Sequence, residues 1–446
     1  MSEYRTGRML LAGGLLGALG VLSAFCLTRL IGLALHLVWL GEIGFHLVEP
    51  HESPWAGRWF TLLFPVIGAG IIGLMLRYGS RMIAGHGIPE AMESILYRDS
   101  RMNLKVAILK PLSAAISIGT GGPYGAEGPI IMTGGAVGSL LGQLFPASAA
   151  ERKVMLAAGA AAGMVGIFGT PLAAVLLVTE LLLFEWSARA LIPVSVSAAV
   201  AMALRAPIMG DSGPLFPDVR VMPLAVGHLP WYLLFGLLAG GAAAGMTWLL
   251  YWIEDRYEAI PWLNYATRPL LGALLVGIVG VFFPRALGVG YDNIAGILSG
   301  QFGVGLVLAI LVGKFAAWSL SLGSGTSGGV LAPILMIGGA LGGLIGHLTV
   351  GLTGLPPGLV ALAFMAALFG ASTRATITAI LFAAEVTGHF DALVPLLFTC
   401  AVATMVAGRL LPYSIMTGKL VRRGRIVVQD YVAPEAPVRE AVVNGD

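Results

Sequence analysis

The stretch GTGGPYGAEGPIIMTGG, residues 119–135, sets a single carboxylate, Glu127, among glycines and apolar side chains. A second segment has a similar sequence. Residues 119–142 and residues 323–346 carry the same amino acid at half of their aligned positions. Chance does not readily produce such agreement over so long a segment. The sequence therefore predicts an internal repeat, with a carboxylate in only one copy.

The composition places the chain in a membrane. Of the 446 residues, 57% are apolar and 11% are charged, whereas charged residues make up about a quarter of a soluble domain. Many apolar runs approach the roughly 20 residues that a helix needs to cross lipid, but several are short or interrupted by Gly and Pro. Such breaks are tolerated in lipid only where the freed backbone groups are buried in protein or line a cavity. We expect an all-α polytopic membrane protein with tilted, partly broken helices around a transport pathway.

The repeat extends beyond the glycine segments and divides the chain. Residues 169–180 are echoed by residues 374–385, in the same order and at nearly the same separation. Five prolines lie between residues 206 and 230 and mark a connection. We therefore expect a cytoplasmic N-terminus (1–9), a first transmembrane repeat (10–205), a connecting loop (206–230), a second transmembrane repeat with a terminal helix (231–420) and a cytoplasmic tail (421–446).

Each glycine segment leads through a proline into an apolar helix. Pro is favoured in the first turn of a helix, and Gly lets backbone N–H groups be approached closely, so each copy presents a helix N-terminus suited to an anion. One terminus contributes roughly 0.3–2 kcal/mol, whereas burial of an unpaired ion costs tens of kcal/mol. Several termini must therefore converge. Two inverted repeats would aim both helices at one point from opposite sides of the midplane.

Arginines flank the outermost apolar runs. By the positive-inside rule, these arginines predict that both termini lie in the cytoplasm and that the number of crossings is even. The expected location is the plasma (inner) membrane. The residues concerned are Arg5, Arg8, Arg422, Arg423 and Arg425.

Four short motifs carry a family likeness. GHGIPE (85–90), GAEGP (125–129), GGVLAP (328–333) and LPYS (411–414) occur in the order, and at about the separations, of the signature regions of the CLC chloride channels and transporters. The chain resembles that family from about residue 10 to about residue 420. The resemblance implies the CLC fold of two inverted repeats, in the prokaryotic form without C-terminal CBS domains, and a homodimer in which each subunit has its own anion pathway.

The resemblance also implies substrates and site residues. The substrates would be small monovalent anions, chloride first, together with protons; bound chloride ions are expected, and no cofactor, metal, nucleotide or nucleic acid. Glu127 would be the gate, because a carboxylate that faces a helix N-terminus imitates the anion it displaces, and an ionisable residue inside an apolar span is a functional candidate. The residues expected to bind the anion are His86, Gly87, Ile88, Gly128, Val330, Leu331 and Tyr413.

Three positions depart from the family pattern. His86 stands where chloride-selective members have Ser and plant nitrate transporters have Pro, so fluoride, nitrate and bicarbonate remain alternatives to chloride. Its imidazole either donates an N–H to the anion, with a charge that would depend on pH, or stays neutral and turns toward the cytoplasmic loop and solvent. Leu331 replaces the usual Phe, and Ala126 replaces the usual Arg or Lys before the gate.

The mode of transport is the least determined property. The coupled members typically have an inward-facing proton glutamate, and Leu181 occupies its place here. An anion/proton antiporter is favoured because Glu127 and Tyr413 are both present, and a passive voltage- or pH-gated chloride channel is the alternative. Glu180, which precedes Leu181, and its repeat equivalent Glu385 are expected to make structural hydrogen bonds at helix ends.

A different class, an intramembrane enzyme, is a remote alternative. Such an enzyme would use a buried nucleophile and a base, for which Ser117, Ser139 and His347 are available. No such pair occurs at matching depth in the way that the repeated Gly–Pro helices do. The chain is therefore expected not to be an enzyme.

Overall fold

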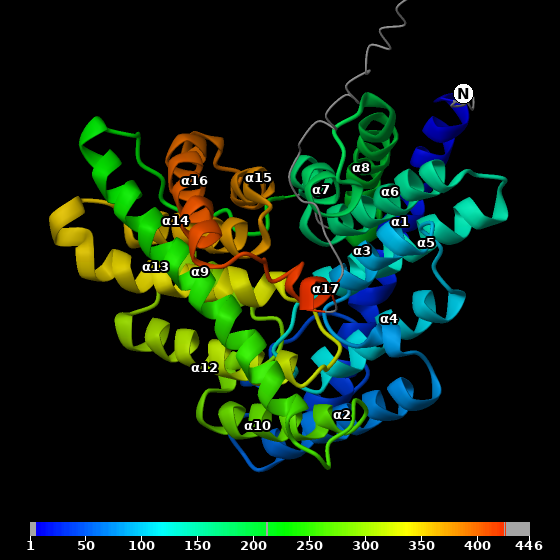
Figure 1. The fold of residues 1–446 in the computed structure, drawn as a ribbon. Helices are drawn as coiled ribbons and strands as arrows, with labels where there is room; N and C mark the ends of the chain where they lie inside the picture. Colours follow the sequence, from blue (N-terminus) through cyan, green and yellow to red (C-terminus); the bar gives the residue numbers. More distant parts are fainter. Residues whose placement is uncertain (1–5, 211–212, 423, 425–446) are drawn as a thin grey trace, which may run out of the picture.

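Figure 1 shows the computed structural model, a helical molecule whose two halves stand side by side. The structure describes residues 6–210, 213–422 and 424. Arg5, Arg423 and Arg425, which entered the orientation prediction, and the tail from residue 425 onward lie outside the described residues. Regular structure within the described part consists of helices, together with two isolated backbone bridges.

The two halves repeat the same order of helices. The first half contains α1 (Thr6–Leu35), α2 (Phe60–Tyr78), α3 (Ile88–Tyr97), α4 (Leu104–Gly119), α5 (Glu127–Leu144), α6 (Ala149–Phe168), α7 (Pro171–Val178) and α8 (Ala188–Met209). The second half contains α9 (Leu229–Glu258), α10 (Arg268–Phe282), α11 (Tyr291–Leu298), α12 (Val304–Gly323), α13 (Leu331–Thr353), α14 (Pro357–Thr373), α15 (Thr376–Thr387) and α16 (Leu393–Leu410), followed by α17 (Gly418–Arg422). Helices α1–α8 thus correspond in order to α9–α16. The segment that joins the halves starts later than expected, because α8 continues past residue 205 to Met209.

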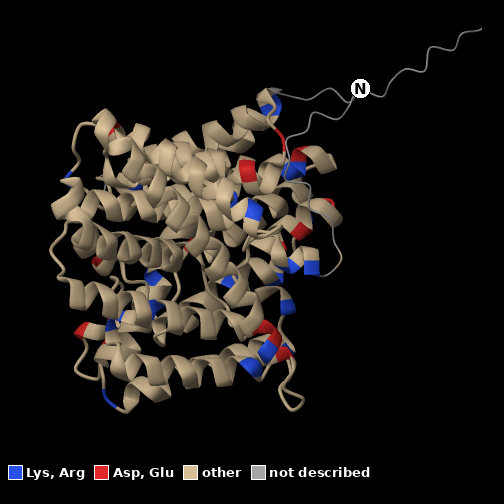
Figure 2. Ribbon diagram, turned by 60° about the vertical axis from the view of Figure 1, so that its left-hand side comes forward, with Lys and Arg blue, Asp and Glu red and all other residues tan. Residues whose placement is uncertain are grey.

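The helices differ widely in length, as a membrane protein with broken helices requires. Seven helical segments of the described chain are long and apolar enough to cross a membrane. The first of them, Gly7–Leu40, has 34 residues, which exceeds the roughly 20 needed for a perpendicular crossing and is compatible with a tilted helix. By contrast, α3 has 10 residues and α11 has 8, so neither can cross the lipid alone. The chain is an integral membrane protein, and Figure 2 shows most charged residues toward two opposite edges, with a charge-poor band between them.

Two glutamates relate the halves by a reciprocal exchange. Glu180 reaches the start of α15, where its Oε2 accepts hydrogen bonds from the Thr378 N–H at 3.1 Å and the Thr378 hydroxyl at 2.5 Å. Glu385 reaches the start of α7, where its two oxygens accept from the N–H groups of Leu172 at 3.0 Å and Ala173 at 2.8 Å. The prediction that both make structural hydrogen bonds at helix ends is confirmed. Each half thus caps a helix of the other, as expected for two repeats related by an approximate two-fold axis.

Candidate functional site

Three glycine-rich loops meet at the centre of the molecule, and each loop leads into a helix. The Gly85 N–H donates to the Thr326 carbonyl at 3.2 Å, and the Gly328 N–H donates to the Gly85 carbonyl at 3.3 Å. The Gly329 N–H donates to the Gly125 carbonyl at 3.1 Å. These backbone bonds bring together the starts of α3, α5 and α13, so three positive helix ends surround one region.

Glycine is required at this junction because the backbones approach more closely than a side chain permits. A Cβ atom on Gly128 would collide with the His86 carbonyl oxygen, and one on Gly329 would collide with the Gly125 carbonyl oxygen. Gly87, the residue before α3, has a φ of +89°, a conformation that other residues adopt only with strain. Glycine at these positions therefore allows the loops to cross one another in close contact.

A buried lysine from α4 fixes this junction. The Lys110 ammonium donates to the carbonyls of Ile83 at 2.9 Å and Gly85 at 2.7 Å, and to the Ser327 hydroxyl at 3.2 Å. The Ser327 hydroxyl also lies 2.9 Å from the Ser113 hydroxyl. Lys110 is fully buried, and a buried ammonium is tolerated only when its protons are bonded. Lys110 thus ties the loop before α3 to the loop before α13.

Glu127, the first residue of α5, is fully buried next to two helix starts. The Tyr291 hydroxyl donates to its Oε1 at 3.0 Å. The carboxylate also faces the backbone amides of Glu127 itself and of Ala332, and Lys314 contributes positive charge from α12. Among the described residues, Oε2 has no partner with close hydrogen-bond geometry. This carboxylate is thus surrounded by hydrogen-bond donors, the positive ends of helix dipoles and a cation. The same surroundings would stabilise a bound anion.

The predicted anion ligands from the first motif lie at this junction. The residue His86 is 6% exposed, so the orientation toward solvent that the sequence left open does not occur. Its ring lies against the backbone of Ile415, and its Nδ1 has no hydrogen-bond partner in the described chain. The Gly87 N–H donates to Glu90 Oε2 at 3.1 Å, so this amide is occupied. Ile88 begins α3 and is buried.

The remaining predicted ligands differ in their position. Gly128 lies in the first turn of α5, and Val330 and Leu331 form the buried start of α13. Tyr413 is half-buried, and its ring packs edge-on against Tyr251 with centroids 5.5 Å apart. The structure therefore gathers the first three at the junction, whereas Tyr413 lies in the segment whose Ile415 backbone contacts His86.

Leu181 occupies a short π-helical turn after α7, η4 (Thr179–Leu183). The residue is 1% exposed. This turn packs against α3. The position that would hold a second, inward-facing carboxylate is thus an apolar buried contact.

Sequence reasoning missed four residues of the site: Lys110, Tyr291, Lys314 and Ala332. The two lysines had a signal, since the shift of 204 residues that relates Gly119 to Gly323 also relates Lys110 to Lys314. A lysine inside an apolar run is itself a functional candidate. Tyr291 had no comparable signal, because its contact with Glu127 joins residues 164 positions apart.

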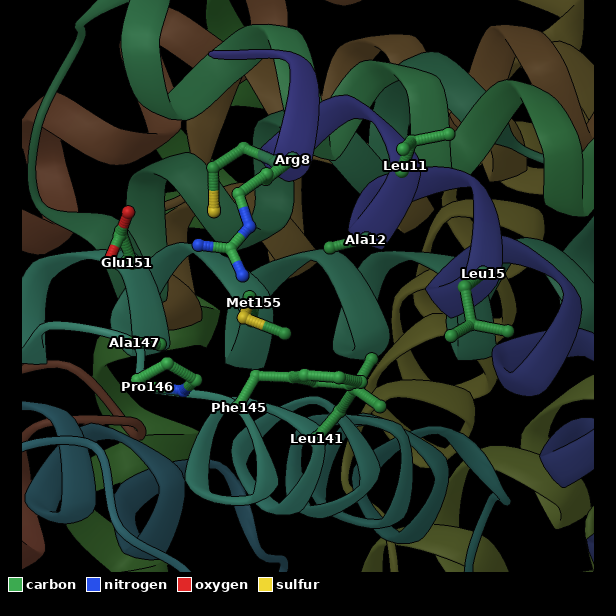
Figure 3. Close-up of a pocket in the computed structure, with 11 residues that line it drawn as sticks. Arg8, Leu11, Ala12, Leu15, Leu141, Phe145, Pro146, Ala147, Glu151 and Met155 are labelled. Atoms are coloured by element: carbon green, nitrogen blue, oxygen red, sulfur yellow. The ribbon is translucent and has the colours of Figure 1, made fainter. Parts of the chain in front are cut away.

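A separate hollow of about 310 Å³ lies at the surface, where α1 starts and α5 ends. In Figure 3 the Arg8 guanidinium stands over an otherwise largely apolar lining. None of the predicted site residues lines this hollow. Its lining residues are Arg8, Met9, Leu11, Ala12, Leu15, Leu141, Phe145, Pro146, Ala147, Glu151 and Met155.

Comparison with known proteins gives consistent likenesses. The family model described as voltage gated chloride channel matches residues 68–408. A putative chloride channel protein ClcB-like from Ralstonia nicotianae is 32% identical over 418 residues, which cover 90% of this chain and 93% of the relative. The H(+)/Cl(-) exchange transporter ClcA from Vibrio cholerae is 29% identical over 441 residues, which cover 93% of each chain.

Solved structures share the fold. A slow cyanobacterial Cl−/H+ antiporter superimposes with a TM-score of 0.82 at 24% identity, covering 93% of this chain and 98% of that one. A CLC-type fluoride/proton antiporter superimposes with a TM-score of 0.77 at 22% identity, with the same coverage. The inverted-repeat architecture predicted from the sequence is therefore confirmed. These relatives are named for transport rather than for catalysis.

Proposed function

We propose, from the premise that this chain belongs to the voltage-gated chloride channel family, that it exchanges small monovalent anions, chloride first, for protons across the membrane. The relatives named above include an H(+)/Cl(-) exchange transporter. Transport rather than catalysis is the expected activity, with no resident cofactor.

One observation supports the exchange proposal most strongly. The Glu127 carboxylate is fully buried between the starts of α5 and α13, with Tyr291 as a donor and Lys314 nearby. Helix starts attract anions, so the carboxylate occupies a place that suits a transported anion. It is therefore a tethered competitor of the substrate.

Competition between carboxylate and anion couples the two fluxes. While the Glu127 carboxylate is ionised and occupies the site between the helix starts, its charge repels an incoming anion. The dipoles of these helix starts then interact with the carboxylate instead of with the anion. When the carboxylate takes up a proton, it loses its charge and its attraction to the helix starts. An anion can then occupy the site, and the proton leaves on the other side when the carboxylate returns. One group thus serves both as gate and as proton carrier.

The test is reconstitution in liposomes with a chloride gradient, recording chloride efflux and proton movement together. Uphill proton movement driven by chloride is the expected result. Glu127→Gln should abolish proton movement and leave anion flux, because the amide cannot carry a proton. Glu185→Gln changes an exposed carboxylate outside the site and should behave like the wild type. Proton movement that persists in Glu127→Gln would refute the gate assignment.

A passive chloride channel is the second candidate, and the buried Leu181 favours it. With an apolar residue at this position, the chain lacks the carboxylate that would carry protons between Glu127 and the cytoplasmic side. The same liposome assay distinguishes the two functions, since a channel would lose chloride down its gradient without moving protons uphill.

His86 is proposed to tune which anion is preferred. Its buried imidazole lies beside the start of α3 and against the Ile415 backbone. His86→Ser would exchange one neutral hydrogen-bonding group for another, so we expect the ratios of chloride, fluoride, nitrate and bicarbonate fluxes to change by up to about tenfold, the equivalent of one neutral hydrogen bond. An unchanged order and unchanged ratios would remove His86 from the selectivity site.

The homodimer that the family implies is proposed to form through α7, α8 and their second-half counterparts. A groove of about 650 Å³ lies mainly between α7 and α8 and is lined almost entirely by small and apolar side chains, with Leu172 about half exposed at its edge. A second copy could fill this groove. Native mass spectrometry in detergent should give twice the subunit mass, and Leu172→Trp should weaken the dimer. A monomeric wild type would contradict this assignment.

A further inference from the structure

Three potential metal ligands meet on the side of the molecule reached after the first membrane crossing. Glu49 and His51 follow the span Gly7–Leu40, and Asp292 lies in the first turn of α11. One ligand atom from each of the three lies within 4.8 Å of the others. The His51 Nε2 is 3.4 Å from Asp292 Oδ2. The cluster therefore joins a loop of the first half to a helix of the second half.

Each side chain of this cluster keeps one polar atom without a partner. Glu49 Oε2, His51 Nδ1 and Asp292 Oδ1 are all buried, and none has a hydrogen-bond partner in the described chain. The His51 side chain is 9% exposed. An unpaired buried polar group costs free energy, so each of the three side chains keeps hydrogen-bonding or ligand capacity that the described chain does not use.

We propose that Glu49, His51 and Asp292 bind a divalent transition-metal ion of the Zn²⁺ class, and that the bound ion slows transport by holding the gate closed. Two carboxylates and one imidazole form the three-ligand set of an open zinc site, with water in the fourth position. The imidazole favours Zn²⁺, Co²⁺ or Ni²⁺ over Mg²⁺ and Ca²⁺, which prefer oxygen ligands.

The geometry is close to that of a bound ion. Metal–ligand bonds of about 2.0–2.2 Å in a tetrahedron separate neighbouring ligand atoms by about 3.3 Å. The His51 Nε2 and Asp292 Oδ2 atoms, 3.4 Å apart, already have about that separation, and a Glu49 ligand atom belongs to the same group within 4.8 Å. Arg285 donates to Asp292 Oδ2 at 3.3 Å and to Asn293 Oδ1 at 2.8 Å. When an ion binds Asp292, Arg285 can lose its longer bond to Asp292 and keep its shorter bond to Asn293.

The cluster adjoins the donor that contacts Glu127. Asp292 directly follows Tyr291, whose hydroxyl donates to the Glu127 carboxylate. Glu49 Oε1 accepts from the N–H of Gly290, the residue before Tyr291. An ion held by both acids would fix the first turn of α11 and keep the Tyr291 hydroxyl on the gate. The inhibition part of the inference rests on the proposed function, whereas the binding part does not.

Binding is measured first, on the purified full chain in detergent, by calorimetric titration with Zn²⁺. One ion per subunit is expected. His51→Ala and the isosteric Asp292→Asn should each weaken binding at least as much as the roughly 10–100-fold that loss of a supporting residue costs. His389→Ala is the matched control, because His389 pairs with Asp391 at 3.6 Å outside any three-ligand cluster of the described residues. Unchanged affinity in both cluster variants, or tighter binding of Ca²⁺ than of Zn²⁺, would overturn the site.

The link to the gate is measured second, by chloride efflux with Zn²⁺ on the side of the liposome that faces the cluster. Zn²⁺ should slow wild-type efflux and have much less effect on His51→Ala, each compared with its own rate in chelator. Tyr291→Phe should bind Zn²⁺ with wild-type affinity yet escape inhibition. Inhibition that persists in Tyr291→Phe would overturn the link, and absence of any anion flux would overturn the proposed function while the titration still decides the site.

Discussion

The loops before α3 and α11 have the same backbone arrangement, and they differ at only a few side chains. Each loop follows a short 3-10 turn, η3 (Arg81–Ile83) and η6 (Pro284–Ala286). Each has two glycines with positive φ, and each is held by a buried lysine from the following long helix, Lys110 in α4 and Lys314 in α12. Duplication therefore provided the same scaffold at two places around the pathway.

The side chains that project from this scaffold are different. In the first loop Glu90 turns back to the Gly87 N–H at 3.1 Å and pairs with Lys419 at 2.7 Å. In the second loop the equivalent Gly290 N–H is bonded by Glu49 from another part of the chain. Tyr291 replaces the apolar Ile88 as the first helical residue. A shared backbone thus holds an apolar helix start in one copy and a donor to the gate in the other.

The largest expected effect comes from removing the lysine that holds each loop. Lys110→Met should lower the free energy of unfolding by roughly 3–6 kcal/mol, because the carbonyls of Ile83 and Gly85 each lose a hydrogen bond from a charged donor, worth about 1.5–3 kcal/mol each. Lys314→Met should cost less, since Lys314 makes one short bond, to the Gly288 carbonyl at 2.7 Å, and one long bond, to Val289 at 3.4 Å. Denaturant unfolding in detergent measures both.

Lys153→Met serves as the control for this pair, because Lys153 lies near the surface in an ion pair with Glu185. Loss of an exposed pair should change stability by no more than about 1 kcal/mol. Equal losses of unfolding free energy for Lys110→Met and Lys314→Met would mean that the two lysines stabilise their loops equally. A loss as small as that of the control would contradict the assignment that these lysines hold the loops.

The next effect concerns the donor that only the second loop has. Tyr291→Phe removes one hydrogen bond to a carboxylate, a bond worth about 1.5–3 kcal/mol. Glu127 should then compete less well with the anion, and chloride should bind at least about tenfold more tightly in calorimetric titration. Phe216→Leu alters an aromatic neighbour of Tyr291 but keeps the hydroxyl, and its chloride affinity should stay near that of the wild type. Unaltered chloride affinity in Tyr291→Phe would separate the second loop from the gate.

The smallest effect tests the glycine before α11. Gly290→Ala places a Cβ at a φ of +78°, where it also meets the Met336 methyl group. The backbone strain amounts to about 1–2 kcal/mol, and the flexible Met336 side chain can move. Gly300→Ala, at a φ of +71° with open space around the Cβ, isolates the strain. Thermal unfolding should rank Gly290→Ala below Gly300→Ala, and the reverse order would show that Met336 does not restrict this turn.

Much of the site was accessible from residue types and spacing. The Gly–Pro helix starts, the buried Glu127 and the division into two halves all follow from local sequence and its repetition. Glu180 and Glu385 were correctly expected at helix ends, although the reciprocal character of their contacts was not. His86 was left between two orientations, since nothing in a motif specifies which neighbours bury an imidazole.

The sequence by itself determined that the chain lies in a membrane, that it consists of two related halves, and that Glu127 stands at a helix start. Composition, period and residue order carry that information without reference to distant contacts. Only the tertiary structure decided that Tyr291 donates to Glu127 across 164 positions, that Lys110 joins the loops, and that Glu49 meets Asp292. Such pairs depend on how broken helices pack, and packing brings together residues whose local sequences contain no reference to each other.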